Sequence, residues 1–325
     1  MMLQGRGGSS PIEAKSGSVG AAWPPKFDSH NSRIKAFCPF VVHDGFYRRK
    51  LFSQLLYGMR DNPDSTRTTA RAFVDKGAIE SIMGRHPAFD IEARFDADYA
   101  VPGCDLVYFA SNAPSRLPEP AVLEQELMSV RQMARLARTS PEEAGSRIRE
   151  GGYSMSHLVS HTESDISQLL ALYQEAYQEY TFDLSAVTIS QMLNNGNIVI
   201  VARDRESNIV SSLIAEHCQL QIEKGPLVSL YELSDYATLR SHRGNGLMTL
   251  MQMEAISSIR GMPQGSSAII YAEDRAPWIA VNKSSQRAGM DYCGTLLQHC
   301  VLVSDRDFGE QGRYENLNVW VHDPR

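Results

Sequence analysis

A strand-like run that leads through a glycine loop into a helix-like run most constrains the fold of this 325-residue chain. Residues 227–238 read as a strand, Gly244 and Gly246 follow, and apolar residues then recur at helical spacing to residue 259. Because glycines let the backbone turn tightly, the first N–H groups of the helix, about residues 244–249, point at whatever lies before them. This order of elements indicates an α/β protein and predicts an anion site.

Arg243 stands directly before this loop and adds a full positive charge to the partial positive charge of the helix start. An Arg-Gly-x-Gly tetrapeptide also occurs as a tight strand-to-helix turn that binds nothing, so its setting matters. The loop has neither the G-x-x-x-x-G-K-[ST] pattern of nucleoside triphosphate sites nor the G-x-G-x-x-G spacing of dinucleotide sites. The diphosphate of coenzyme A therefore fits the loop better than either nucleotide, without a metal ion.

Strand-like and helix-like segments alternate from about residue 32 onward, which predicts two α/β domains of similar size. We expect a disordered tail over residues 1–28, an N-terminal domain over 29–140 and a C-terminal domain over 141–325. The tail is small, polar and aperiodic. Residues 114–152 hold four prolines and a Gly-Gly pair, which is typical of a connection between domains.

Composition excludes several classes of function. The net charge of −6 disfavours nucleic acid as a partner. Five scattered cysteines without a C-x-x-C pair, and histidines without ligand spacing, predict neither a disulfide framework nor a metal site. No apolar run approaches the length of a membrane span, and the N-terminus lacks a secretion signal. We expect a cytoplasmic protein whose partner is a small molecule.

The loop from Arg243 to Gly246 resembles motif A of the GCN5-related N-acetyltransferase (GNAT) superfamily, in which such a loop holds the coenzyme A diphosphate. Asn282, leading to Gly289, is similar to the motif B helix. Met248 stands where the superfamily has glycine or alanine. The resemblance implies a coenzyme-binding set made of Ala237, Thr238, Leu239, Arg243, Gly244, Asn245, Gly246, Leu247, Met248 and Asn282.

Four segments resemble the beta-lysine N-acetyltransferase family more closely: residues 232–238, Arg275-Ala276 with Asn282, 294–296 and 315–320. The resemblance implies a C-terminal GNAT domain, with a mixed, largely antiparallel central sheet flanked by helices, and an N-terminal degenerate GNAT-like α/β domain. It further implies acetyl-CoA as donor, coenzyme A as product, and an amine of beta-lysine or a related diamino acid as acceptor. The sequence leaves the oligomeric state open, with a homodimer as one option.

Transfer of an acetyl group to an amine requires a base that removes a proton from the ammonium. Glu232 lies six residues before Thr238, so the alternation of a regular strand places both on one face of the sheet. Glu232 also stands where GNAT enzymes resembling this chain have their base; the alternative is a buried carboxylate paired with an arginine such as Arg275. In a regular strand Asp235 faces the opposite side of the sheet from Glu232. A bulge would turn it into the same cleft, where it would bind the substrate ammonium or serve as an alternate base. The alternative is that Asp235 stabilises a turn.

The leaving thiolate takes up a proton, which GNAT enzymes often supply from a tyrosine four residues before the motif B glycine. That position is Ser285 in this chain, and a serine hydroxyl is a much weaker acid. Ser285 therefore only hydrogen-bonds the sulfur, or Tyr271 or Tyr292 replaces it, or the thiolate leaves unprotonated.

Three further residues are candidates for the substrate site. Arg275 is suited to bind a substrate carboxylate or the coenzyme, with helix capping as the alternative. Tyr180 and Phe182 are similar to an aromatic stretch of the family and are expected to wall the substrate site, unless they only anchor the loop.

Two other functions remain as alternatives to an acetyl-CoA-dependent N-acetyltransferase. One is a tandem-GNAT transferase that takes its acyl group from charged tRNA, which needs a basic groove that the net charge disfavours. The other is a protein that binds acyl-CoA without catalysis, which Met248 and Ser285 favour and Glu232 opposes.

Overall fold

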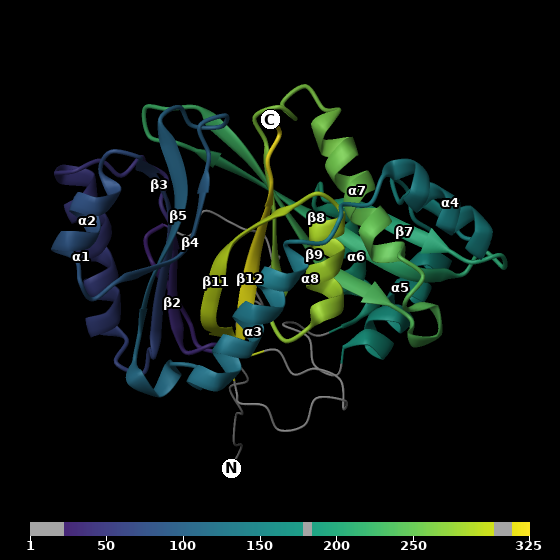
Figure 1. Ribbon diagram of the computed structural model, residues 1–325, viewed down its shortest axis with the longest axis horizontal. Coiled ribbons are helices and arrows are strands. Elements are labelled where there is room, and N and C mark those ends of the chain that lie inside the picture. The colour runs from purple at the N-terminus through teal and green to yellow at the C-terminus, as the bar shows by residue number, and fades with distance from the viewer. Residues whose placement is uncertain (1–22, 178–183, 302–313) are drawn as a thin grey trace, which may run out of the picture.

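Twelve strands form one mixed sheet in the computed structural model, which describes residues 23–177, 184–301 and 314–325 (Figure 1). The strands are β1 (Lys26–Asp28), β2 (Arg33–Phe37), β3 (Arg67–Asp75), β4 (Asp90–Asp96), β5 (Cys104–Asn112), β6 (Ser154–His157), β7 (Ile198–Arg203), β8 (Ile209–Gln221), β9 (Leu227–Thr238), β10 (Ile269–Arg275), β11 (Asp291–Cys300) and β12 (Glu315–His322). They lie in the order β1-β2-β3-β5-β4-β11-β12-β10-β9-β8-β7-β6. Among the described strands only the pairs β2–β3 and β9–β10 are parallel, which confirms the mixed, largely antiparallel sheet.

Helices flank this sheet, as expected. They are α1 (Phe46–Asp61), α2 (Ile79–Arg85), α3 (Pro120–Met133), α4 (Pro141–Gly151), α5 (Glu163–Ala176), α6 (Ala186–Asn194), α7 (Leu247–Arg260) and α8 (Ile279–Arg287), with short 3-10 turns η1 (Pro114–Arg116) and η2 (Arg240–His242). The start of α5 shows why the sequence folds this way. The Thr162 hydroxyl accepts from the Asp165 N–H at 3.2 Å, and the Asp165 carboxylate accepts from the Thr162 N–H at 2.8 Å.

The N-terminal and C-terminal strands meet where Ala93 of β4 pairs with Gly294 of β11. This is the one register position recorded between those two strands within the described part of the chain. A Cβ atom on Gly294 would lie 2.1 Å from the Glu92 carbonyl oxygen and 2.6 Å from Ala93 Cα. The close approach of the two backbones therefore requires glycine at this junction.

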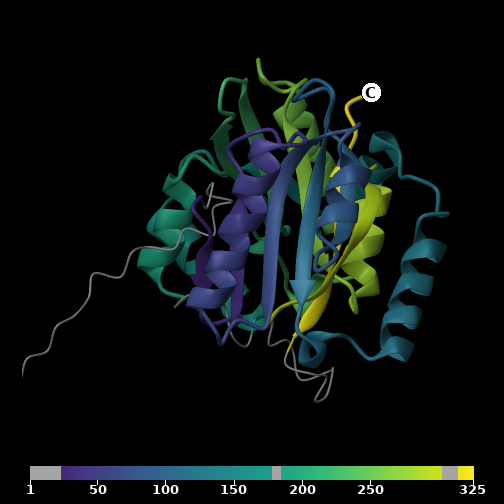
Figure 2. The ribbon, with the colours of Figure 1, turned by 90° about the vertical axis from the view of Figure 1, so that its left-hand side faces the viewer.

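The sheet bends at this junction, as a cluster of apolar side chains shared by its two halves shows. Phe73 and Tyr108 of the N-terminal half share one buried cluster with Leu230 and Tyr271 of the C-terminal half. Since β3 and β9 are far apart in the strand order, the halves must face each other across this cluster. The outer face of the N-terminal strands is covered by α1 and α2 (Figure 2).

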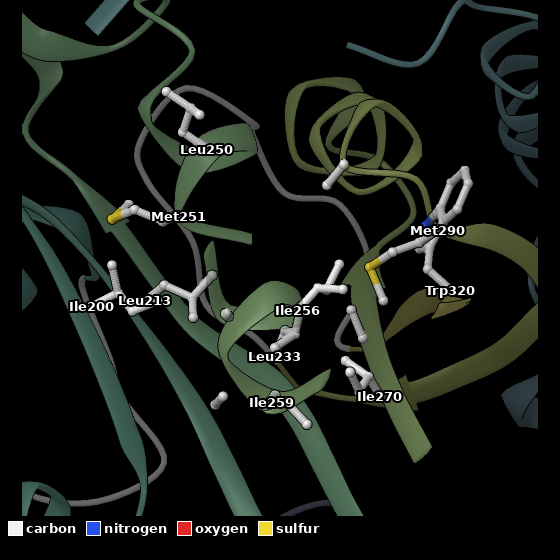
Figure 3. Close-up of a cluster of buried hydrophobic side chains, with 14 of the residues drawn as sticks. Ile200, Leu213, Leu233, Leu250, Met251, Ile256, Ile259, Ile270, Met290 and Trp320 are labelled. Atoms are coloured by element: carbon white, nitrogen blue, oxygen red, sulfur yellow. The ribbon is translucent and has the colours of Figure 1, made fainter. Parts of the chain in front are cut away.

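The C-terminal strands bury both of their faces. On one face α7 supplies Ile256 and Ile259, which lie beside Leu233 and Ile270 of the sheet (Figure 3). The other face packs against α5 and α6. These two faces, called the α7 face and the α5 face below, determine which side chains of β9 can meet.

Some boundaries differ from the expectation. The sequence reading missed α4, and it began α7 at Gly244, whereas the helix begins at Leu247 because Gly244 and Gly246 have positive φ angles of 83° and 76°. The domain boundary near residue 140 stays a prediction, although α3, which precedes it, packs on α8 of the C-terminal half. The GNAT-like character of the N-terminal half also stays a prediction. No described helix is both long enough and apolar enough to cross a bilayer.

Candidate active site

Strands β9 and β10 separate partway along their length. They pair from Leu230 with Ile269 to Leu233 with Ala272, and no pair follows within the described strands. Beyond that point β10 continues on β12 and β9 continues on β8. The C-terminal ends of two parallel neighbours thus diverge, and ligands of α/β sheets commonly bind at such an edge.

A bulge in β9 lies at this divergence. Ser234 pairs with Ile214 and Ala237 with Ser212, so Asp235 and Tyr236 of β9 stand opposite one residue of β8. Asp235 has a φ of 50°, the left-handed conformation that such a bulge uses. Two tyrosines of the α5 region hold it: Tyr173 donates to the Asp235 carbonyl at 3.3 Å, and Tyr177 to the Tyr236 carbonyl at 2.5 Å.

The bulge reverses the alternation of side chains along β9. Leu233 packs on the α7 face, and the Tyr236 hydroxyl, three residues later, accepts a hydrogen bond from Gln252 of α7 at 3.0 Å. Ala237 packs on the α5 face, so Thr238 returns to the α7 face. Glu232 lies on the face opposite Leu233. The expectation that Glu232 and Thr238 share a face is therefore wrong, because it assumed a regular strand.

The Glu232 carboxylate lies in a polar cluster between the two halves of the protein. Tyr271 of β10 donates its hydroxyl proton to Glu232 Oε2 at 2.8 Å. Arg71 of β3 donates to the Tyr271 hydroxyl oxygen at 2.9 Å and to Glu273 Oε1 at 2.5 Å. Burial, followed by the charge of Glu273, raises the pKa of Glu232 to about 8, and Arg71 opposes this rise.

Two more carboxylates, on β8 and β9, have raised pKa values. Burial raises the pKa of Glu216 on β8 to about 7, while the Ser234 hydroxyl donates to its Oε1 at 2.9 Å. Burial also raises the pKa of Asp235 to about 7, and the Asp235 charge acts on Tyr173 and Tyr177. The bulge has thus turned Asp235 towards the α5 face, the face that Glu232 also occupies.

The glycine loop lies at the exposed start of α7. At Gly244 and Gly246 an added Cβ would meet no atom within 4 Å, so open space lies in front of both. No side chain in the ranges that the structure describes caps the first N–H groups of α7. The Asn245 amide donates to the Tyr153 hydroxyl at 3.1 Å and to the His242 carbonyl at 2.9 Å, which fixes the loop. The Arg243 side chain is exposed and donates from Nε to the Thr238 carbonyl at 3.1 Å.

The remaining residues of the expected coenzyme set lie beside this loop, mostly with internal roles. Leu247 is buried, and Met248 packs against the apolar cluster between α7 and the sheet, so the long Met248 side chain is turned away from the loop. The Thr238 hydroxyl lies 2.6 Å from the Ser211 hydroxyl, and the Ala237 carbonyl accepts from Ser211 at 2.8 Å. The Leu239 N–H donates to the Val210 carbonyl, so that N–H is not available to a ligand.

Asn282 has a different environment from the one expected. It is fully buried, and its amide donates to the carbonyl groups of Arg275 and Trp278 at 2.8 and 2.9 Å. Its oxygen accepts from Asn318 at 2.8 Å and from the Trp320 indole at 2.9 Å. These four bonds use the whole capacity of an asparagine side chain, so Asn282 joins α8 to β10 and β12 and has nothing left for coenzyme.

Ser285 and Arg275 are likewise occupied. Ser285 is fully buried, donates to Asp274 Oδ2 at 2.5 Å and accepts from Gln252 at 2.9 Å. Arg275 forms a two-pronged ion pair with Glu315 rather than with Glu232. Neither side chain therefore offers a free group to a substrate in this structure.

The two tyrosines considered as replacements for Ser285 are also bonded: Tyr271 donates to Glu232, and Tyr292 lies 2.6 Å from the Thr295 hydroxyl. Tyr180 and Phe182 lie outside the described residues. No cluster of metal-ligating side chains occurs in the part of the chain that the structure describes.

Sequence reasoning missed the contributions of Arg71, Glu273 and Tyr153. Arg71 of β3 and Tyr153, which directly precedes β6, are distant in sequence from Glu232 and the loop, so no local spacing marks them. Glu273 follows Tyr271 by two residues in β10, and period-two alternation was a signal that could have placed it on the face of Glu232.

No family model and no curated protein matches the sequence. Several solved structures are similar to about half of the chain. One is NAA60 from Arabidopsis thaliana in complex with a bisubstrate analogue, with 12% identity, a TM-score of 0.41, and coverage of 52% of this chain and 97% of that chain. The ribosomal-protein-alanine N-acetyltransferase from Brucella melitensis has 23% identity, a TM-score of 0.38 and coverage of 52% and 98%. The phosphinothricin acetyltransferase from Sinorhizobium meliloti in complex with AcCoA has 14% identity, a TM-score of 0.41 and coverage of 53% and 88%.

Proposed function

We propose that this protein is a GNAT-type N-acetyltransferase that transfers the acetyl group of acetyl-CoA directly to a primary amine of a small substrate. One observation carries the proposal. The uncapped start of α7, with open space before Gly244 and Gly246, stands next to the divergence of β9 and β10. A diphosphate at the loop would leave the rest of a long cofactor directed along the end of β9, the strand that carries Glu232.

The loop residues fit a diphosphate on physical grounds. Positive φ at both glycines directs the backbone around an open space, and the first N–H groups of α7 have no side-chain acceptor. Arg243 is exposed beside them. We assign the diphosphate to Arg243, Gly244, Asn245, Gly246 and the N–H groups that follow, and we leave Asn282 out. When bound, acetyl-CoA supplies an acetyl group activated as a thioester.

Glu232 is proposed as the general base. An ordinary alkylammonium has a pKa of about 10.4, and an ordinary glutamate one of about 4.3. A pKa of about 8 makes Glu232 a far better match for removing the ammonium proton. Asp235 and Glu216 lie on the same face and are suited to bind the ammonium, with Asp235 as the alternate base.

The amine is proposed to belong to an amino-acid-like compound, of which beta-lysine or another diamino acid is implied by the sequence resemblance alone. Tyr180 and Phe182 remain proposed walls of this site. Arg275 remains proposed for a substrate carboxylate only through exchange with Glu315, because that carboxylate occupies both edges of its guanidinium. Ser285 has no proposed catalytic step.

Two measurements test the proposal. Isothermal titration with acetyl-CoA and coenzyme A measures binding, and a thiol-release assay over amino acids, beta-lysine and polyamines measures transfer. Gly246→Ala places a methyl group in the open space at a position with φ of 76°, and Gly103→Ala adds the same strain at φ of 75° in the β4–β5 turn. We expect both variants to lose similar stability and only Gly246→Ala to lose coenzyme affinity.

Each outcome has a separate meaning. Coenzyme binding with thiol release that disappears in Glu232→Gln supports the transferase. Binding without release from any amine supports a coenzyme-binding protein instead. If neither acetyl-CoA nor coenzyme A binds, the proposal is refuted, and transfer from charged tRNA becomes the leading alternative.

A further inference from the structure

The N-terminal half reaches into the hydrogen-bonded cluster around Glu232 through Arg71. Arg71 lies on β3, on the inner face that also carries Phe73 of the cluster between the halves. Its guanidinium lies 5.0 Å from the centre of the Tyr108 ring and 5.4 Å from that of the Tyr271 ring. The Arg71 side chain is 19% exposed and its partner Glu273 is 7% exposed, so both are held away from bulk water.

The bonding of Arg71 has a direction. One guanidinium nitrogen donates to Glu273 at 2.5 Å, and the other donates to the Tyr271 hydroxyl oxygen at 2.9 Å. Because that oxygen accepts from Arg71, the hydroxyl proton is left to point at Glu232, 2.8 Å away. In such a chain of hydrogen bonds, the bond from Arg71 polarises the Tyr271 hydroxyl and so strengthens the bond from that hydroxyl to Glu232. The charge of Arg71 thus acts on Glu232 through Tyr271.

We propose that Arg71 is a positioning residue, which holds the Glu232 carboxylate in place and favours its charged form through the Tyr271 hydroxyl. The N-terminal half is then part of the active centre and not only a wall of the cleft. The role of Glu232 as a base rests on the proposed function above, whereas the coupling of Arg71 to Glu232 is independent of that function.

Charged and titratable groups face Glu232 from five elements. They are Tyr271 and Glu273 on β10, Glu216 on β8, Arg71 on β3, Tyr108 on β5 and Lys35 on β2. Both carboxylates raise the pKa of Glu232, and Arg71 lowers it. Lys35 interacts with Glu232 through charge. Removing the charge of Arg71 therefore takes away one of the groups that oppose the repulsion by Glu273 and Glu216, and it shifts the Glu232 pKa upward.

The experiment measures the carboxyl group of Glu232 directly. The full-length protein is labelled with glutamate carrying ¹³C at the side-chain carboxyl, and its NMR resonances are followed from pH 5 to pH 10. Glu232→Gln identifies the resonance by its loss. The titration is repeated in Arg71→Gln, in the charge-conserving Arg71→Lys and in Tyr271→Phe. Arg94→Gln is the matched control, because Arg94 is a half-exposed arginine of β4 that pairs with Asp105 at 2.5 Å.

We expect the Glu232 pKa to rise by about one unit or more in Arg71→Gln, which corresponds to a tenfold change in the proton equilibrium. It should rise in Tyr271→Phe as well, return most of the way in Arg71→Lys and stay at the wild-type value in Arg94→Gln. An unchanged pKa in folded Arg71→Gln overturns the proposal. If Arg71→Gln does not fold, Tyr271→Phe decides, because it leaves the Arg71–Glu273 pair in place.

The same variants separate this inference from the proposed function. If the wild type transfers acetyl groups, the acid limb of kcat/KM in Arg71→Gln should move by the same amount as the Glu232 pKa. If the Glu232 pKa moves but the acid limb of kcat/KM does not, the coupling of Arg71 to Glu232 is supported and Glu232 is rejected as the base. A wild type that transfers nothing refutes the proposed function, and the NMR titration still tests the role of Arg71.

Discussion

Replacement of Asp274 by asparagine should stabilise this protein at alkaline pH. Asp274 of β10 is 2% exposed, and one of its oxygens accepts from Ser285 while the other, Oδ1, has no hydrogen-bond partner within the described part of the chain. Burial raises its pKa from 3.8 to about 7. Above pH 7 the fold therefore contains a buried carboxylate charge that no cation among the described residues balances.

The magnitude and sign follow from proton linkage. Because the folded pKa is above the unfolded one, the unfolded chain binds fewer protons between about pH 4 and pH 7, and the free energy of unfolding falls as pH rises through that window. A difference of about three pH units at 1.36 kcal/mol each gives a cost of about 4 kcal/mol above pH 7, as an upper bound. Asp274→Asn removes this cost and adds a penalty of about 1–3 kcal/mol for an amide group without a full set of partners.

Urea unfolding of the wild type and Asp274→Asn at pH 5 and pH 8 isolates the charge. The amide penalty is the same at both pH values, so it cancels when the two stability differences are subtracted. We expect Asp274→Asn to gain about 2.7 kcal/mol relative to the wild type between pH 5 and pH 8, because about two of the three pH units of the cost, from pH 5 to the folded pKa of about 7, lie inside this window. The other buried carboxylates are present in both proteins and cancel too.

Asp90→Asn, at an exposed position at the start of β4, is the control and should show no such change. If Asp274→Asn destabilises the protein equally at both pH values, Asp274 is already neutral or is paired, and the reasoning from burial fails.

Three further predictions follow from the site and the sheet. Glu232→Gln should lower kcat/KM by about 10²- to 10⁴-fold and remove the acid limb of its pH profile, as steady-state thiol release will show. Asn282→Ala should lose about 3–5 kcal/mol in urea unfolding, because it strands two buried donors and two carbonyl groups, whereas exposed Asn194→Ala should lose under about 1 kcal/mol; unchanged stability with lost coenzyme binding would return Asn282 to the coenzyme site. Gly294→Ala should cost more than about 2 kcal/mol and expose the β4–β11 junction to proteases, unlike Gly103→Ala, since its methyl group would overlap the Glu92 backbone.

Local chemistry was readable in the sequence. The periodicity of residues 227–238 and the two glycines after them predicted β9, the loop and α7, because strand alternation and positive φ depend on a few neighbouring residues. The capping box that begins α5 is equally local, since it joins Thr162 and Asp165, three residues apart. The bulge at Asp235 was considered but not decided, since its cause lies in the register with β8 and in Tyr173 and Tyr177.

The amino-acid sequence by itself indicated the alternation of strands and helices, although not α4, and the loop that can present N–H groups to an anion, while the mixed sheet was implied by the family resemblance. The tertiary structure alone decided that β4 meets β11, that Arg71 reaches Glu232 through Tyr271, and that the Asn282 and Ser285 side chains form their hydrogen bonds within the protein. The difference is physical. Backbone conformation and side-chain alternation are set over a few residues, whereas burial and the partner of a polar group are set by segments that meet only after the sheet bends.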